Sequence, residues 1–258
     1  MSKLDHALYE IHRMDAISER DQWVNRMHPL VKLIVTVCFI SVTVSFSKYD
    51  LSGILRMGVY PIAIFILGEI SFRDALKRLR IVLPLVCLVG LFNPFFDRQP
   101  ALDLGAVTVT GGMLSMLTLT LKGIYSVMAS YLLIASTSIE KICYAMRLLH
   151  VPSVIVTQVL LTYRYISLLL TEANCMTQAY ALRAPRQKGV HIKAWGSFAG
   201  QLLLRSMERA EEVYESMALR GYRGEFYYLK KQPCQLKDYM YLASWCAVFF
   251  LLRMLWNK

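Results

Sequence analysis

The chain has 258 residues, of which 56% are hydrophobic and only 18% are charged, and its mean hydropathy is +0.41. A soluble domain usually carries about 25% charged residues, so this composition disfavours an ordinary soluble enzyme. It also excludes a disordered chain, which would lack large apolar residues. The 29 Lys and Arg against 18 Asp and Glu give a net charge of +11. No DNA- or RNA-binding motif accompanies this charge, and the positive-inside bias of a membrane protein explains it most simply.

Apolar segments in the first half of the chain predict four membrane spans. A spanning helix needs about 20 mostly apolar residues, and the candidates are residues 30–46, 51–70, 81–96 and 113 to about 137. Lys32 lies near the start of the first, from where its side chain can extend to the lipid headgroups. Pro84 and Pro94 predict a kinked or tilted path for the third.

The distribution of basic residues predicts the orientation. Residues 71–80 carry four basic residues and one acid, so this loop and the N-terminus are expected in the cytoplasm. Residues 138–238 hold 14 Lys and Arg against 8 Asp and Glu and are expected there too. Within them, 151–170 is apolar enough to span, but a crossing would place 11 Lys and Arg of 172–238 outside. We therefore interpret 151–170 as a buried or interfacial helix.

A last span is predicted from 239 to about 252. The expected fold is thus an all-α membrane protein with about five transmembrane helices and a cytoplasmic helical domain before the last span. Its divisions are residues 1–137 with the N-terminal segment and four spans, 138–238 with the cytoplasmic helices, and 239–258 with the last span. Five spans would place the C-terminus outside.

The cytoplasmic segment is predicted to form helices over about 140–149, 152–184 and 194–220. The last two end on related motifs, Ala181-Leu182-Arg183-Ala184 and Ala218-Leu219-Arg220-Gly221. Each arginine falls in the last helical turn, where the helix dipole favours a cation, and Gly221 suits a left-handed C-terminal cap. Either both arginines are simply C-terminal helix residues, or each pairs with a carboxylate across an interface. Spacing leaves both interpretations open.

These motifs, together with several other segments, resemble the transmembrane T-component of energy-coupling factor (ECF) transporters, and most closely the CbiQ type of cobalt uptake systems. The segments are HPLVKL at 28–33, FNPFFDRQP at 92–100, KICYAMRLLHVP at 141–152, TYRYI at 162–166 and LLLRSMERAEEVYESMALRGY at 202–222. One departure is Ala184-Pro185, where the family commonly has Gly or Ser after the arginine.

The resemblance implies a coupling subunit with no ATPase site and no substrate pocket of its own. Its partners would be two ABC-type ATPase subunits and a small metal-binding membrane subunit, with ATP and metal bound by those partners. The ATPase contacts it implies are Arg183 and Arg220, with Ala181, Ala184, Ala218 and Gly221 as small neighbours. Cobalt is the expected substrate, and nickel or a vitamin are the alternatives. The implied location is the bacterial inner membrane.

What the sequence lacks agrees with this interpretation. It has no GxxxxGK[ST] nucleotide-binding loop, its five His are scattered, and its six Cys have no metal or redox spacing. No nucleophile–base pair or carboxylate pair indicates a membrane enzyme. Lys122, in the middle of the fourth predicted span, is the one feature that favours a different class, a stand-alone secondary transporter or channel.

Overall fold

The computed structural model describes residues 3–18, 23–68, 71–96, 100–103, 108–185, 189–224 and 234–254. These are helical except for turns, loops and two short antiparallel strands, β1 (Pro100–Asp103) and β2 (Thr108–Thr110). The all-α class is therefore confirmed. The chain divides into two compact units. We call Ser18–Ser138 with Gln232–Lys258 the bundle unit, and Met1–Ile17 with Ile139–Lys231 the hairpin unit.

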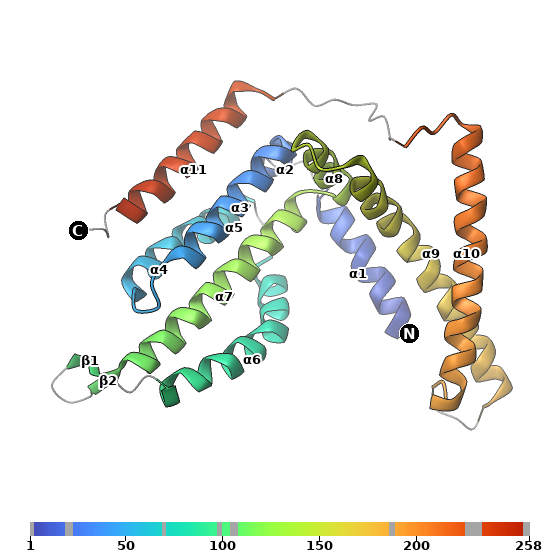
Figure 1. The fold of residues 1–258 in the computed structure, drawn as a ribbon, viewed down its shortest axis with the longest axis horizontal. Coiled ribbons are helices and arrows are strands. Elements are labelled where there is room, and N and C mark those ends of the chain that lie inside the picture. Colours follow the sequence, from blue (N-terminus) through green and yellow to red (C-terminus); the bar gives the residue numbers. More distant parts are fainter. Residues whose placement is uncertain are drawn as a thin grey trace. The chain divides into compact units, whose positions relative to one another are not determined.

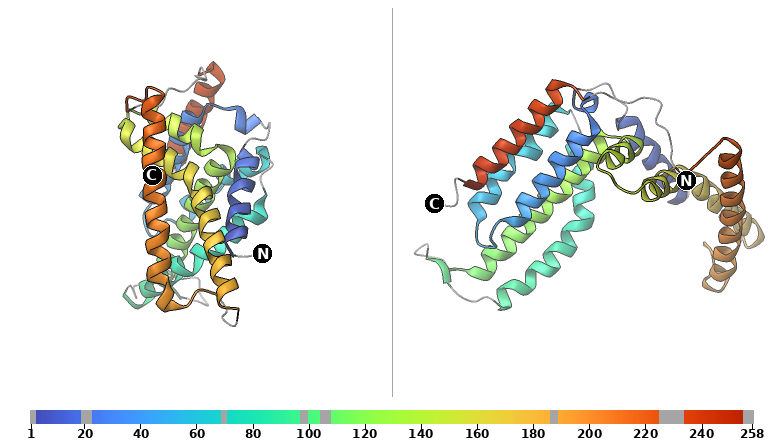
Figure 2. Two further views of the ribbon diagram at one scale, coloured as in Figure 1. Left: turned by 90° about the vertical axis from the view of Figure 1, so that its right-hand side faces the viewer. Right: turned by 45° about the horizontal axis from the view of Figure 1, so that its top comes forward.

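The bundle unit holds the apolar helices. They are α2 (Trp23–Arg26), α3 (Pro29–Ser45), α4 (Leu51–Met57), α5 (Val59–Leu67), α6 (Phe72–Phe96), α7 (Gly111–Ser136) and α11 (Leu236–Met254). Helix α7 packs between α6 and α3, and α11 packs on α3 (Figure 2, right). Helices α3, α7 and α11 match predicted spans closely.

The second predicted span is interrupted. Of the predicted residues 51–70, Leu51–Met57 and Val59–Leu67 form two helices, α4 and α5, separated at Gly58, and residues 69–70 lie outside the described part of the chain. Pro61 explains the break, because it has no N–H to donate to the carbonyl of Met57 four residues earlier. The Gly58 N–H instead bonds the Leu55 carbonyl at 3.1 Å, which closes the first helix.

The prediction that residues 71–80 form a loop is wrong, because the chain is helical from Phe72 onward. This segment forms the first part of α6, which continues through Pro84 to Phe96 and changes direction along its length (Figure 1). Leu, Ala, Lys and Arg are all good helix formers. The helix therefore continues from the charged residues before 81 into the apolar residues that follow. The Ser71 carbonyl accepts from the Asp74 N–H at 3.2 Å as this helix begins.

Apolar side chains lie on both the inside and the outside of the bundle unit. Val35, Phe39 and Ile54 are buried, whereas Ile66 and Leu85 are largely exposed. Apolar outer faces on helices are typical of a protein surrounded by lipid. By length and composition α7 can cross a membrane, and shorter apolar helices cover Pro29–Ser45, Leu51–Leu67 and Val82–Phe92.

The hairpin unit consists of α1 (Lys3–Ser18), α8 (Ile139–Leu148), α9 (Ser153–Arg183), a 3-10 turn η1 (Ile192–Ala194) and α10 (Trp195–Leu219). The three predicted helices 140–149, 152–184 and 194–220 are confirmed. Helices α9 and α10 form an antiparallel hairpin (Figure 1). Helix α1 joins α9 through the Tyr163 hydroxyl, which donates to the Asp15 carboxylate at 2.5 Å.

Helix α9 also passes the length and hydropathy test for a span. It contains most of the segment 151–170, whose charge context favoured a buried or interfacial position. That position stays a prediction, which cysteine labelling can test.

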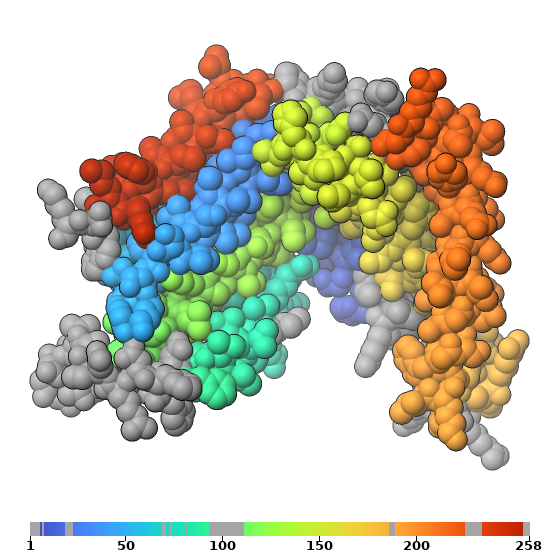
Figure 3. Space-filling model, viewed as in Figure 1, coloured from blue at the N-terminus to red at the C-terminus, as the bar shows by residue number. Residues whose placement is uncertain are grey.

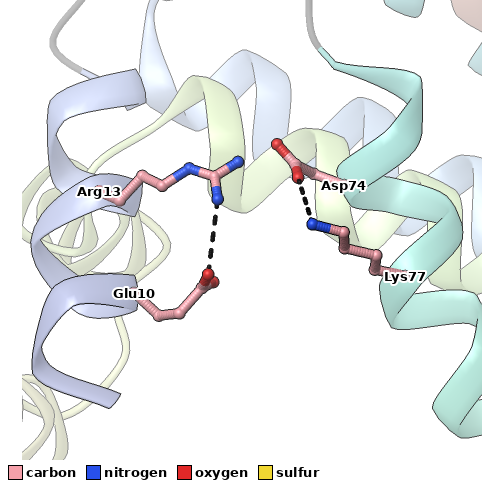
Figure 4. A network of polar contacts seen from close by, with 4 residues as sticks. All are labelled: Glu10, Arg13, Asp74 and Lys77. Carbon is pink, nitrogen blue, oxygen red and sulfur yellow. Dashed lines mark hydrogen bonds and ion pairs between the residues drawn. The ribbon is translucent and has the colours of Figure 1, made fainter. Parts of the chain in front are cut away.

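Surface ion pairs contribute little to this fold. Figure 4 shows two of them, Glu10–Arg13 at 3.5 Å in α1 and Asp74–Lys77 at 4.0 Å in α6. Each joins residues three apart on one helix. Exposed pairs of this kind contribute on the order of 0.5 kcal/mol or less, so burial and helix capping have to position the functional residues.

Candidate functional site

The ends of α9 and α10 present the two related motifs at the surface. Leu182 is 84% exposed and Leu219 is 90% exposed, and the arginine that follows each is also exposed. Single exposed leucines are common on proteins. The same leucine–arginine pair at the ends of two successive helices is less ordinary, and it gives each end an apolar and a cationic group.

Gly221 ends α10 as predicted. Its φ is +79°, its N–H bonds the Ala218 carbonyl at 3.0 Å, and the next N–H, of Tyr222, bonds the Met217 carbonyl at 3.0 Å. This pair of bonds is the Schellman arrangement, which satisfies the last carbonyls of a helix. The chain therefore leaves the helix directly after Arg220.

The end of α9 has a different geometry. Ala184 has φ −130° and ψ 65°, and its N–H bonds the Tyr180 carbonyl at 3.0 Å. Pro185 follows, so the helix ends without a left-handed residue at this point. The departure from the family pattern noted in the sequence thus coincides with a different exit. The two motifs share residue types but not backbone conformation.

A groove of about 430 Å³ lies between α9 and the C-terminal part of α10. Three arginines line it, Arg164 from α9 and Arg209 and Arg220 from α10, with Glu212 as the acidic residue of the lining. Arg209 and Glu212, three residues apart on α10, form an ion pair at 3.0 Å. The remaining lining is Leu161, Tyr165, Val213, Ser216, Met217, Gly221 and Tyr222. The groove therefore combines a positive charge with aromatic and apolar walls.

The structure brings Arg220 together with Arg164 and Arg209, but Arg183 does not line this groove. Sequence reasoning missed Arg164 as a neighbour of Arg220. The signal was available in the register of the hairpin, in which Arg205 of α10 pairs with Glu172 of α9. In an antiparallel hairpin that pairing places Arg164 opposite Val213, about one helical turn from Arg209, and all three residues line the groove.

The short helix α8 is held against α9 by the side chains of its buried face. Cys143 and Ala145 are buried, and α8 packs on α9. Burial, with a smaller effect of the Glu140 carboxylate, raises the pKa of the Cys143 thiol. The thiol is therefore protonated at neutral pH and behaves as an apolar packing group.

Lys122, the predicted intramembrane lysine, caps a helix. Its Nζ donates to the carbonyls of Val44 and Phe46 at 3.0 and 2.6 Å, where α3 ends. Arg253 donates to the neighbouring Ser45 carbonyl at 3.1 Å. Cations at the C-terminus of a helix satisfy carbonyls and complement the dipole. This arrangement gives the charge a structural partner and weakens the case for a stand-alone transporter or channel.

Lys32 makes the reciprocal contact, from α3 to the end of α7. It is 5% exposed, and its Nζ donates to the Ser136 carbonyl at 2.7 Å. The interpretation that Lys32 can extend to the lipid headgroups is therefore wrong, because its side chain is buried and bonded within the protein. Because α3 and α7 run antiparallel, the start of α3 lies beside the end of α7, and the lysine satisfies a carbonyl there.

His28 begins α3, as expected from its place before Pro29. Its Nδ1 accepts from the Leu30 N–H at 3.3 Å, and its own N–H donates to Asp238 Oδ1 at 3.1 Å. The other carboxylate oxygen of Asp238 accepts from the Gln235 N–H at 2.9 Å. Among the described residues, no group of three or more His, Cys, Asp and Glu could hold a metal ion.

Comparison with known proteins gives three similar chains. One, 28% identical over 82% of this chain and 75% of its own length, is an uncharacterized protein of Methanocaldococcus jannaschii. Two are energy-coupling factor transporter transmembrane proteins EcfT. That of Listeria innocua is 24% identical over 79% of this chain and 82% of its own. That of Clostridium kluyveri is 22% identical over 92% of this chain and 95% of its own.

A family model, described as the cobalt transport protein CbiQ, matches residues 20–229. The match covers most of the chain and includes α8, α9, α10 and both arginine motifs. It confirms the resemblance inferred from the sequence motifs, and it describes a membrane component of transporters and not a family of enzymes. The chain belongs to the CbiQ family of cobalt transport proteins.

Proposed function

We propose that this chain is the transmembrane coupling component of an ATP-driven ECF-type uptake transporter. In this proposal two ABC-type ATPase subunits bind the hairpin unit, and a small substrate-binding membrane subunit binds the bundle unit. ATP and the transported metal are bound by those partners. The N-terminus lies in the cytoplasm, and the bundle unit crosses the inner membrane of a bacterium several times. Cobalt is the proposed substrate because the family description names it.

The observation that carries the proposal is the arginine-lined groove at the end of α10. Arg164, Arg209 and Arg220 outnumber the acidic residue Glu212 there, so the groove fits an acidic side chain of another protein. The adjoining Leu219, 90% exposed, offers an apolar contact beside it. A guanidinium pairs with a carboxylate through two parallel hydrogen bonds. Two parallel hydrogen bonds fix the orientation of the guanidinium relative to the carboxylate, so the pair can stay formed when the ATPase subunit moves.

Arg183 supplies the second proposed contact. It ends α9 and follows the exposed Leu182, but it lies outside the groove. Two contacts at the ends of two helices suit a pair of ATPase subunits that change their separation. Helix α9, 31 residues long, would carry that movement away from the ATPases.

The test uses the chain co-expressed with its ATPase and membrane partners and reconstituted in proteoliposomes. Arg183→Ala and Arg220→Ala should each weaken ATPase capture or ATP-driven uptake, and the double variant should lose both. Removing one partner of a desolvated charge pair costs about 2–5 kcal/mol, so a loss of tenfold or more is expected. Arg223→Ala is the matched control, an exposed arginine three residues beyond Arg220 and outside the groove. Normal uptake by the double variant would refute the assignment.

The substrate is tested in the same vesicles. Uptake of Co²⁺ that unlabelled Co²⁺ suppresses more strongly than Ni²⁺ supports cobalt. Preferential suppression by Ni²⁺ favours the nickel alternative, and uptake of neither ion favours the vitamin alternative. Because the substrate is bound by the partner, exchanging that partner while keeping this chain should change which solute is transported.

A further inference from the structure

A buried polar cluster ties three helix ends of the bundle unit together. It consists of His28 and Lys32 at the start of α3, Ser136 at the end of α7, and Asp238 at the start of α11. Lys32 is 5% exposed and Asp238 is 7% exposed. The contacts are Lys32 Nζ to the Ser136 carbonyl at 2.7 Å and the His28 N–H to Asp238 Oδ1 at 3.1 Å.

Each contact joins parts of the chain that are remote in sequence, 104 residues apart for Lys32 and Ser136 and 210 for His28 and Asp238. Burying a lysine or a carboxylate is unfavourable unless hydrogen bonds satisfy it. Here the hydrogen bonds go to backbone groups at helix termini, the N–H and C=O groups that a helix leaves unpaired. The cluster therefore holds positions of the backbone and not merely of side chains.

The chain passes between the two units three times, and the cluster holds positions at the second and third of these passages; the first, from Ile17 to Ser18, is not part of it. Ser136 comes two residues before the bundle unit ends at Ser138, and the hairpin unit resumes at Ile139. On the return, the bundle unit begins again at Gln232, and Asp238 also accepts from the Gln235 N–H at 2.9 Å. Both passages are thus fastened to the first turn of α3.

We propose that Lys32 and Asp238 are positioning residues for energy coupling. They hold the ends of α7 and α11 to the start of α3, so that a force arriving along either passage moves all three helices together. Without them, the helix ends could fray and absorb the movement. This inference rests on the proposed coupling function. It adds two residues that bind no ATPase and no substrate.

Lys122 provides a matched control. Like Lys32, it donates from one helix of the α3–α7 pair to terminal carbonyls of the other. It does so at the opposite end of α3, away from the two passages that the cluster holds. Loss of a lysine cap therefore affects stability in both variants, but only Lys32 lies where the proposed force enters.

The experiment measures ATP hydrolysis and substrate uptake in the same proteoliposomes of the full complex. Lys32→Met should leave ATPase binding and hydrolysis in place while uptake per ATP falls at least about fivefold, the lower end of measured coupling between sites. Lys32→Arg, which keeps a donor, should restore the ratio. Lys122→Met should lower thermal stability but keep uptake per ATP near the wild-type value.

Asp238→Ala tests the second half of the anchor and should lower the same ratio, since both N–H groups lose their acceptor. Asp238→Asn keeps one acceptor oxygen and should give a ratio of uptake to ATP hydrolysis between those of Asp238→Ala and wild type. This variant tests the inference if Lys32→Met or Asp238→Ala prevents assembly of the complex. An unchanged ratio in the assembled Lys32 and Asp238 variants would overturn the inference, as would an equal fall in Lys122→Met. If wild-type vesicles show no ATP-driven uptake, the proposed function fails instead.

Discussion

At the scale of single residues, the backbone at Gly221 matters as much as the arginine before it. A φ of +79° is strained for any residue with a Cβ, and the space around this glycine is open, with no other side chain or backbone within 4 Å of the position that a Cβ would take. Any penalty for substitution therefore comes from the backbone alone. The penalty would act on the turn that leads the chain from Arg220 through Gly221 to Tyr222.

Gly221→Ala should destabilise the end of α10 by about 1–2 kcal/mol, the penalty for a left-handed L-residue. Gly221→Asn should be milder, because asparagine tolerates this conformation. Hydrogen exchange of the last turn of α10, measured by mass spectrometry, checks both. Gly200→Ala is the control: it lies within α10, also in open space, and should stabilise the helix by up to about 1 kcal/mol. Equal exchange in Gly221→Ala and wild type would contradict the capping role.

Sequence alone predicted Gly221 correctly and Lys32 wrongly, for one physical reason. A left-handed cap depends on residues next to one another, which the sequence displays. The acceptor of Lys32 is 104 residues away, and only the antiparallel packing of α3 on α7 reveals it. Arg164 was missed in the same way, because its relation to Arg220 depends on the register of two helices.

At the scale of elements, close approach of α6 and α7 depends on a small residue. A Cβ at Gly123 of α7 would meet Val86 Cγ1 and Cγ2 of α6 at 3.1 and 3.2 Å. Because lipid provides no hydrophobic driving force between helices, they associate there through such close packing. This contact fixes one side of α7, whereas the lysine caps fix the side facing α3.

Gly123→Leu should separate α6 from α7 and lower the stability of the chain in detergent by about 1–3 kcal/mol, the usual effect of overpacking. Thermal unfolding followed by size-exclusion chromatography measures it. Val86→Ala combined with Gly123→Leu should recover part of the loss, because it removes the two methyl groups that clash. A double variant no more stable than Gly123→Leu would show that this pair does not determine the packing.

Hydropathy predicted the helices of the bundle but not their ends. The second span was predicted as one helix, although Pro61 interrupts its hydrogen bonding and gives α4 and α5. Residues 71–80 were predicted as a loop because charge was taken as the end of a helix. Residues with high helix propensity continue a helix across a change in polarity. The helix therefore begins at Phe72, about two and a half turns before the apolar segment that begins at residue 81.

At the scale of the whole molecule, the membrane topology depends on α9. The apolar residues 151–170 allow a span, while the charge of the following segment favours the cytoplasm. The two topologies place η1, which contains Lys193, on opposite sides of the membrane.

A single cysteine at Lys193, in a chain whose six native cysteines are replaced, distinguishes the two. The five-span topology predicts labelling by a membrane-impermeant maleimide in inverted vesicles and protection in intact cells. Lys193 is exposed, so accessibility is not limited by the fold. A cysteine at Lys48, which is exposed beyond the end of α3, is the control and should react from the outside. Labelling of position 193 in intact cells would place α9 across the membrane.

The exposed leucines at the ends of α9 and α10 also bear on how a cell must produce this protein. Leu182 and Leu219 project almost fully from their helices, and Figure 3 shows the side chains of α10 lying at the surface along its length. A chain made in excess of its partners would keep these apolar tips uncovered, where chaperones and quality-control proteases recognise apolar residues. Steady-state abundance should therefore follow the gene dosage of the partners, and orphan copies should be short-lived.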